Sequence, residues 1–201
     1  MSTQPGRRYT LEEYFALELA SEEKYEYFDG EVFAMSGGSR DHEQIVANLL
    51  VTLRNALRGR ECRVYPSNLR VTVPSQPPYR YPDLTALCDA PRFEKIGGVD
   101  ALVNPTLIVE VLSPTTEAYD RGDKFTHYKS IGSFAKYLLV AQHRPHVTHY
   151  VKGGDGAWKY EELNDLNESL RLETLDCRLA LGDIYEGVEF PPLPPPPLER
   201  A

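Results

Sequence analysis

The stretch Leu107-Ile-Val-Glu-Val-Leu112 is apolar at every position except Glu110. A short apolar run rich in β-branched residues predicts a strand that is buried on both faces. A carboxylate in such a strand is costly to bury unless another group pairs with it. The alternative to a functional role is a buried ion pair with Lys124 or an arginine, but such pairs contribute little net stability. The sequence therefore favours a functional acid in a buried strand.

A helix and a second strand are expected directly after this run. Ser113 is suited to the N-cap position and Pro114 to the first helical position, which predicts a helix that reaches about Ser130. The apolar segment 137–141 predicts the next strand. Two strands joined by a helix are expected to be parallel, with a right-handed crossover.

The N-terminal part of the chain predicts a short helix and a hairpin. Thr10-Leu-Glu-Glu13 is typical of a capping box, and the helix that it opens is expected to end near Ala20. Asp29-Gly30 lies between two strand-like segments, 25–28 and 31–35, and this dipeptide is a strong signal for a tight hairpin turn.

The remaining pattern predicts an α/β domain whose central sheet is mixed, as in α+β folds. Apolar residues recur at helical spacing between Asp41 and Leu57, and the order from Asp41 to Ala141 is expected to be α-β-β-β-β-α-β. We therefore expect a mixed central sheet flanked by helices, with added hairpins, over residues 1–190, followed by a proline-rich tail over residues 191–201. The other predicted strands are 62–65, 69–73, 83–88, 147–152, 157–162, 170–175 and 178–181.

Composition limits the partners and the location of the protein. The chain has 201 residues and a formal net charge of −8, which argues against a surface that grips nucleic acid everywhere but allows an acidic metal site. It contains no apolar signal core and no run of about 18 apolar residues, so we expect a soluble, cytoplasmic protein without a membrane segment. The three cysteines are far apart, and we expect them to be buried thiols in a reducing cytosol.

Two acids could together hold a divalent metal ion. Asp83 follows Pro82 at the start of a predicted strand, and Glu110 lies in another strand, so the two carboxylates could converge on one Mg²⁺ or Mn²⁺. Such an ion would support hydrolysis of a phosphodiester by neutralising the phosphate and activating water. The backbone carbonyl of Leu112 is a further candidate oxygen ligand.

The predicted helix after these strands carries an amine that could assist this chemistry. Asp120, Lys124 and Tyr128 are spaced four residues apart and should share one helical face. We expect Lys124 to orient or polarise the attacking water, or to contact the scissile phosphate. Asp120 is expected to orient Lys124 or to cap the helix rather than to bind metal, and Tyr128 is a possible further site residue.

These residues resemble the PD-(D/E)XK nuclease superfamily and, more specifically, the bacterial Uma-two family of restriction-type endonucleases. The pattern of the superfamily has a lysine two residues after the second acid, where this chain has Leu112. The resemblance implies that the amine has migrated to Lys124. It covers roughly residues 10–185 and is carried by Phe28-Asp-Gly-Glu31, His42, Tyr81-Pro-Asp83, Val109-Glu-Val-Leu-Ser-Pro-Thr-Thr116, Asp120, Lys124, Tyr128 and Lys136-Tyr-Leu-Leu-Val140.

The resemblance implies a function and two further candidate residues. It implies a restriction-endonuclease-like core, Mg²⁺-dependent cleavage of DNA, and a homodimer in which each subunit presents one site to one strand. It also implies that Glu31 adds an acid to the site. His42, at the start of the long predicted helix, is a candidate ligand of substrate or water, with packing or capping as its alternative. The rival functions are an inactive nuclease-fold scaffold and a phosphoesterase that acts on a small nucleotide.

Overall fold

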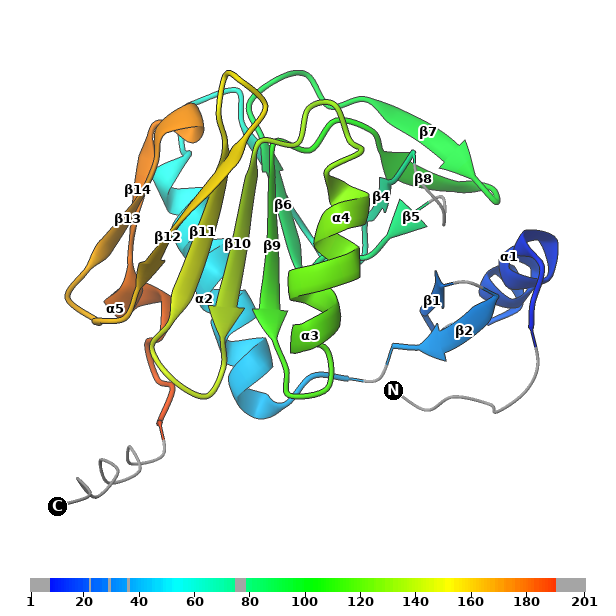
Figure 1. Ribbon diagram of the computed structural model, residues 1–201, viewed down its shortest axis with the longest axis horizontal. Helices are drawn as coiled ribbons and strands as arrows, with labels where there is room; N and C mark the ends of the chain where they lie inside the picture. The colour runs from blue at the N-terminus through cyan, green and yellow to red at the C-terminus, as the bar shows by residue number, and fades with distance from the viewer. Residues whose placement is uncertain (1–7, 22, 29, 36, 75–78, 191–201) are drawn as a thin grey trace, which may run out of the picture.

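A six-stranded mixed sheet forms the centre of the protein (Figure 1). The structure, a computed structural model, describes residues 8–21, 23–28, 30–35, 37–74 and 79–190, so the predicted tail at 191–201 lies outside the described residues. The strands lie in the order β12-β11-β10-β9-β6-β3. Their bounds are β3 Arg63–Pro66, β6 Leu84–Leu87, β9 Leu107–Leu112, β10 Lys136–Ala141, β11 Val147–Lys152 and β12 Trp158–Leu163.

The predicted central strand and its parallel neighbour are both confirmed. Every residue of β9 is buried. Strand β9 is parallel to β10, with Glu110 opposite Leu139, and antiparallel to β6. A helical connection joins β9 to β10 and consists of α3 (Glu117–Tyr119), a π-helical turn (Asp120–Lys124) and α4 (Phe125–Tyr128).

Helices cover the two faces of this sheet (Figure 1). On one face, α2 (Arg40–Ala56) buries Ile45, Leu49 and Leu53 against the sheet, together with the strand pair β13 (Ser169–Leu172) and β14 (Cys177–Ala180). A short 3₁₀ turn (Glu173–Leu175) joins this pair, and α5 (Leu181–Ile184) follows it. The other face packs against α4 through Phe125 and Tyr128. The predicted helix between Asp41 and Leu57 is therefore confirmed, and the sheet has apolar layers on both sides.

The helix after β9 starts later than the sequence predicted. Its first residue is Glu117, with Thr116 at the N-cap position, and not Ser113 followed by Pro114. Ser113 accepts a hydrogen bond from the Thr116 backbone N–H at its own Oγ (3.2 Å), and its backbone N–H donates to Thr116 Oγ1 (3.4 Å). These reciprocal bonds close a separate turn before the helix begins, and this turn lies at the end of β9.

Three strands were not predicted. Strands β5 (Tyr79–Arg80), β7 (Phe93–Ile96) and β8 (Val99–Leu102) join β4 (Arg70–Thr72) in a second sheet of order β5-β4-β8-β7. The predicted element order between the two helices was therefore incomplete. Strand β5 has only two residues, and all of β7 except its last residue is exposed, so neither has the alternation of apolar residues that identifies a strand in a sequence.

The N-terminal helix and hairpin form as predicted. Helix α1 (Leu11–Ala20) begins with the expected capping box of Thr10 and Glu13. Strands β1 (Tyr25–Phe28) and β2 (Glu31–Ala34) pair antiparallel, and Gly30 between them has a φ of 83°, which favours glycine. Asp29 of the predicted turn lies outside the described residues.

A buried glutamate fastens this N-terminal unit to the second sheet. Glu18 of α1 forms an ion pair with Arg70 of β4 and accepts a hydrogen bond from the Tyr81 hydroxyl (2.9 Å). Its other oxygen accepts from the backbone N–H of Tyr25 at the start of β1 (2.6 Å). Glu18 therefore fixes the start of β1 relative to β4.

Two of the cysteines are not the free thiols that we expected. Cys62 and Cys88 form a disulfide, whereas Cys177 is free and half-buried. Cys62 precedes β3 and Cys88 follows β6, and because Arg63 is opposite Leu87 in this antiparallel pair, the two cysteines are the next opposite residues. The separation of 26 residues hides this contact from a reading of sequence spacing.

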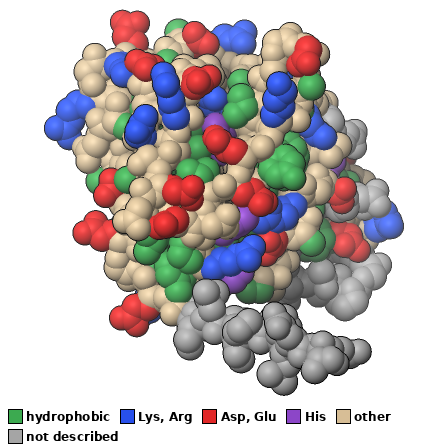
Figure 2. All heavy atoms as spheres, turned by 60° about the vertical axis from the view of Figure 1, so that its left-hand side comes forward, with side chains coloured by type: hydrophobic (Ala, Val, Ile, Leu, Met, Phe, Trp, Pro, Cys, Tyr) green, Lys and Arg blue, Asp and Glu red, His purple; other side chains and the backbone are tan. Residues whose placement is uncertain are grey.

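The surface mixes charges of both signs. Figure 2 turns the β12–β14 side of the molecule toward the viewer, and acidic and basic side chains are interspersed over the described part of this face. Among the described residues, no helix is long and apolar enough to cross a membrane.

Candidate active site

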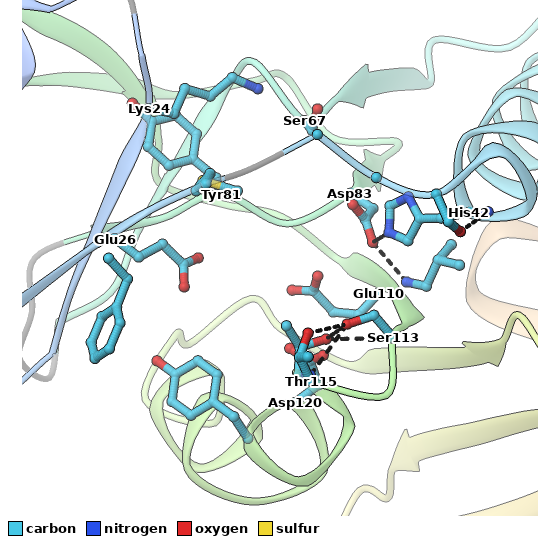
Figure 3. Close-up of a pocket in the computed structure, with 18 of the residues that line it drawn as sticks. Lys24, Glu26, His42, Ser67, Tyr81, Asp83, Glu110, Ser113, Thr115 and Asp120 are labelled. Carbon is cyan, nitrogen blue, oxygen red and sulfur yellow. Dashed lines mark hydrogen bonds and ion pairs between the residues drawn. The ribbon is translucent and has the colours of Figure 1, made fainter. Parts of the chain in front are cut away.

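A cleft of about 960 Å³ opens beside the carboxyl end of β9 (Figure 3). Its walls come from the β1–β2 hairpin, the start of α2, the turn at residues 67–68, the turn at 113–116 and the helical segment that follows. Five of the residues predicted to be functional line it: His42, Asp83, Glu110, Asp120 and Lys124. The fold therefore gathers into one cleft residues that lie up to 82 positions apart in the sequence.

Sheet register places Asp83 and Glu110 side by side. Leu84 of β6 is opposite Val109 of β9, so in this antiparallel pair Asp83 is opposite Glu110. Opposite residues project their side chains from the same face of a sheet. Asp83 is further fixed because its Oδ2 accepts a hydrogen bond from the backbone N–H of Val111 (2.7 Å).

The helical segment adds an amine and a phenol to the same carboxylate. Lys124 Nζ lies 2.9 Å from Glu110 Oε1 and 3.4 Å from Asp120 Oδ1. The Tyr128 hydroxyl donates to Glu110 Oε1 (2.8 Å). An amine on the helix thus reaches the acid of β9, although the strand itself has a leucine at position 112.

The π-helical turn helps these three helical residues to converge. In a regular α-helix, residues eight positions apart differ in direction by about 80°. The turn Asp120–Lys124 is wider, because a π-helix bonds residues five apart, and this reduces the difference. Asp120, Lys124 and Tyr128 consequently all face the end of β9, as their spacing predicted.

The structure brings in an acid that the sequence did not single out. Glu26 of β1 lines the cleft, and its Oε1 lies 3.7 Å from Lys124 Nζ. This oxygen is buried and has no hydrogen-bond partner among the described residues. Glu31, the acid expected from this hairpin, is exposed and is not among the residues that line the cleft. The sequence Tyr25-Glu-Tyr27 could have indicated that Glu26 is a site residue, since an acid between two aromatic residues of a strand resembles the setting of Glu110.

The backbone carbonyl that faces the cleft is that of Val111, one residue before the predicted Leu112. The N–H and C=O of a strand residue point to the same side of the strand. Val111 directs its N–H toward Asp83 and lines the cleft, so its carbonyl points to that side too. Leu112, whose carbonyl we expected to be a ligand, is paired with Ala141 of β10 and does not line the cleft.

His42 supports Asp83 from the other face of the sheet. It lies in the first turn of α2, where its backbone N–H donates to the N-cap Ser39 Oγ (3.2 Å). Its Nε2 lies 3.4 Å from Asp83 Oδ2, and its Nδ1 lies 3.3 Å from Glu43 Oε1. Burial alone would lower the pKa of His42, but the bond to Asp83 and the two nearby acids outweigh burial and raise this pKa.

Negative charge is concentrated around one ammonium group. Burial raises the pKa of Glu110 well above its usual range, Lys124 opposes this rise, and Asp120 and Asp83 add to it. Burial also raises the pKa of Asp120. Burial on its own would lower the pKa of Lys124, but Glu110, Glu26 and Asp120 outweigh it and raise that pKa well above the usual value. Lys124 is therefore a protonated cation among carboxylates.

This donor set fits a hard divalent cation. Among the described residues, no three His, Cys, Asp or Glu side chains are already arranged as a metal centre, and the Lys124 ammonium lies between the acids. The carboxylate oxygens that surround the cleft are nevertheless the ligands that Mg²⁺ and Mn²⁺ prefer. The buried Oε1 of Glu26, which accepts no hydrogen bond from the described residues and lies at ion-pair distance from Lys124, adds a further oxygen to this set.

Comparison with known proteins identifies a family and relatives of this chain. Residues 11–182 match the family described as "Uma2: Putative restriction endonuclease". The chain is 37% identical over 187 residues to "Uncharacterized protein slr1290" of Synechocystis sp., covering 92% of this chain and 96% of that relative. It is 32% identical over 161 residues to "Uncharacterized protein sll1609" of the same organism, covering 80% of this chain and 90% of that relative.

A solved structure has the same fold. It is described as a putative nuclease belonging to DUF820 from Anabaena variabilis, and it matches with a TM-score of 0.67 at 18% identity, over 88% of this chain and 97% of that one. The predicted fold class, a mixed central sheet flanked by helices, is confirmed. The predicted family is confirmed as well: this chain belongs to the Uma2 putative restriction endonuclease family.

Proposed function

We propose that the protein is a Mg²⁺- or Mn²⁺-dependent endonuclease that hydrolyses DNA phosphodiester bonds in this cleft. The observation that carries the proposal is the convergence of Asp83, Glu110 and Lys124, which come from two strands and a helix, at the end of β9. Membership of a restriction endonuclease family supports the reaction class.

The acids and one carbonyl would hold the ion. Asp83 and Glu110 are the primary ligands in this proposal, and the Val111 carbonyl replaces that of Leu112 because Val111 faces Asp83. Glu26 completes the oxygen set with its Oε1, which accepts no hydrogen bond among the described residues. A bound divalent ion supplies charge neutralisation at the phosphate and a lower pKa for its water.

Lys124 acts as a cation and hydrogen-bond donor rather than as a base. Its raised pKa keeps it protonated at neutral pH, so it has no lone pair with which to accept a proton from water. It is placed to donate to a phosphate oxygen or to hold the attacking water. Asp120 positions the ammonium, and Tyr128 fixes the carboxylate of Glu110.

We propose that the active form is a homodimer, because cutting both strands of a duplex calls for two clefts related by a two-fold axis. The β1–β2 hairpin and the β11–β12 hairpin are the candidate contacts, and Tyr160 on β12 is 66% exposed. Sedimentation analysis of the active protein tests this part of the proposal. A protein that cuts DNA while remaining monomeric would contradict it.

The acidity of the cleft favours a second candidate, a metal-dependent phosphoesterase that acts on a small nucleotide. Such a substrate brings few phosphates, so its turnover would depend weakly on salt. An inactive scaffold is the third reading, favoured by the leucine at position 112 and the net charge of −8. Binding of a divalent metal ion distinguishes the endonuclease and the phosphoesterase from the scaffold, which has no need of the ion.

Calorimetric titration with Mg²⁺ and Mn²⁺, paired with a plasmid-nicking assay, tests the proposal. The wild type is compared with Glu110→Ala and with Glu94→Ala, which removes an exposed acid of β7 outside the cleft. We expect Glu94→Ala to retain metal binding and nicking and Glu110→Ala to lose both. Metal binding without nicking would favour the small-nucleotide enzyme, and a folded wild type that binds no metal at millimolar concentration would favour the scaffold.

A further inference from the structure

The charged residues in the wall of the cleft are mostly acidic. Among the described residues, its charged side chains other than His42 are six acids, Glu23, Glu26, Glu43, Asp83, Glu110 and Asp120, and two lysines, Lys24 and Lys124. Lys124 is surrounded by three carboxylates. Lys24 has no ion-pair partner in the part of the chain that the structure describes, so its charge is available to a ligand in the cleft.

The fold fixes the position of Lys24 and engages its charge only in a cation–π contact. Lys24 immediately precedes β1, and its carbonyl accepts a hydrogen bond from the Met35 backbone N–H (2.9 Å). Its Nζ lies 5.8 Å from the centre of the Tyr81 ring. The Tyr81 hydroxyl is already held by Glu18 and Arg70, so the fold does not require Lys24 to fix this tyrosine.

Lys24 and Glu26 project to the same side of the hairpin. Residues two apart in an extended chain share a face and lie about 7 Å apart. Figure 3 places the Lys24 side chain on the upper wall of the cleft, across from Glu110 and Asp120. Ser67 and Asn68, which also line the cleft, are neutral and could donate hydrogen bonds nearby. This wall also carries Glu23 and Glu26, so Lys24 is its cationic group, with the neutral donors Ser67 and Asn68 nearby.

We propose that Lys24 binds a phosphate that flanks the scissile phosphate of the nucleic-acid strand. This inference rests on the proposed function, because the acids and Lys124 define where the scissile phosphate would lie. Lys24 then positions the strand and touches no reacting atom. Because an acidic cleft repels a polyanion, Lys24, the one described lysine of its wall outside an ion pair, has a large share in holding the substrate.

The test compares Lys24→Gln, Lys24→Arg and a matched control, Lys95→Gln, which removes an exposed lysine of β7 outside the cleft. Binding of a fluorescein-labelled oligonucleotide, as single strand and as duplex, is measured by anisotropy in Ca²⁺ over a series of salt concentrations. Mn²⁺ affinity is measured by calorimetry on the same proteins. The metal titration reports on the proposed ion site independently of substrate.

We expect Lys24→Gln to lose about tenfold in oligonucleotide affinity, the effect of removing one favourable charged contact. The slope of log affinity against log salt should fall by about 0.7 for a single strand or about 0.9 for a duplex. Lys24→Arg should retain affinity and slope, Lys95→Gln should match the wild type, and Mn²⁺ affinity should be the same in all four proteins.

Two outcomes overturn the proposal, and they can be distinguished. If the wild type binds the oligonucleotide and Lys24→Gln matches Lys95→Gln in both affinity and slope, Lys24 contacts no phosphate, and the proposed function stands. If the wild type binds neither oligonucleotide, the proposed function fails and the role of Lys24 fails with it.

Discussion

Replacing Lys124 by methionine should destabilise the protein strongly in the absence of metal. The Lys124 side chain is only 7% exposed and is the cation nearest to Glu110, Asp120 and Glu26. Methionine nearly preserves the volume and removes the charge. Breaking a buried ion pair by removing one partner typically costs about 3–5 kcal/mol, because the other charge is left uncompensated. We therefore expect a loss of about 3 kcal/mol or more at neutral pH.

The same variant should show a distinctive dependence on pH. Burial raises the pKa of Glu110, and loss of Lys124, which lowers it, should raise it further. Between the unfolded and the raised folded pKa, the folded protein binds more protons, so its stability falls as pH rises. The stability deficit of Lys124→Met should therefore be larger at roughly pH 8 than at about pH 5, where protonation of the acids neutralises the cluster.

Urea denaturation followed by the fluorescence of Trp158, the single tryptophan, measures both effects. Trp158 packs against Phe125 and Phe134, so its emission reports on the face of the sheet that carries the site. Lys129→Met, at the exposed C-terminal end of α4, is the control and should cost less than about 1 kcal/mol. Equal stability of Lys124→Met and wild type at the higher pH in EDTA would refute the buried charge cluster.

Three further predictions concern the support of the site. Tyr128→Phe removes a buried hydrogen bond to Glu110 and should cost about 1–2 kcal/mol in urea denaturation; an unchanged midpoint would show that the bond contributes nothing. Glu18→Gln should loosen the β1–β2 hairpin and weaken Mn²⁺ binding by calorimetry, an expectation that unaltered affinity would contradict. Reducing the Cys62–Cys88 disulfide, which spans 26 residues, should cost about 3 kcal/mol and lower the thermal midpoint, and identical melting curves with and without reductant would argue against it.

The sequence singled out candidate site residues whose side chains are unusual for their local pattern. Glu110 was evident because a carboxylate inside an apolar strand is costly, and the structure indeed buries it. The shared face of Asp120 and Lys124 followed from helical spacing, which the π-helical turn preserves. Asp83 depended on its pairing with Glu110, and the register of β6 with β9 provides that pairing.

Features that depend on contacts between distant segments could not be predicted in the same way. Glu26 reaches the cleft because long-range contacts hold β1 in place, among them that of Glu18 with Arg70 across 52 residues. The choice between Val111 and Leu112 depends on which neighbouring strand each residue faces, and a sequence does not show the neighbours of a strand. The Cys62–Cys88 disulfide likewise requires the pairing of β3 with β6.

The central claim is that Asp83 and Glu110 hold one divalent ion. Anomalous diffraction from crystals grown with Mn²⁺ tests it most directly, because the anomalous signal locates the metal without reference to activity. We predict a peak in the cleft at about 2 Å from oxygens of both carboxylates, with Lys124 Nζ displaced from its place beside Glu110. A well-ordered cleft with no peak, or a peak only at another surface of the protein, would contradict the claim.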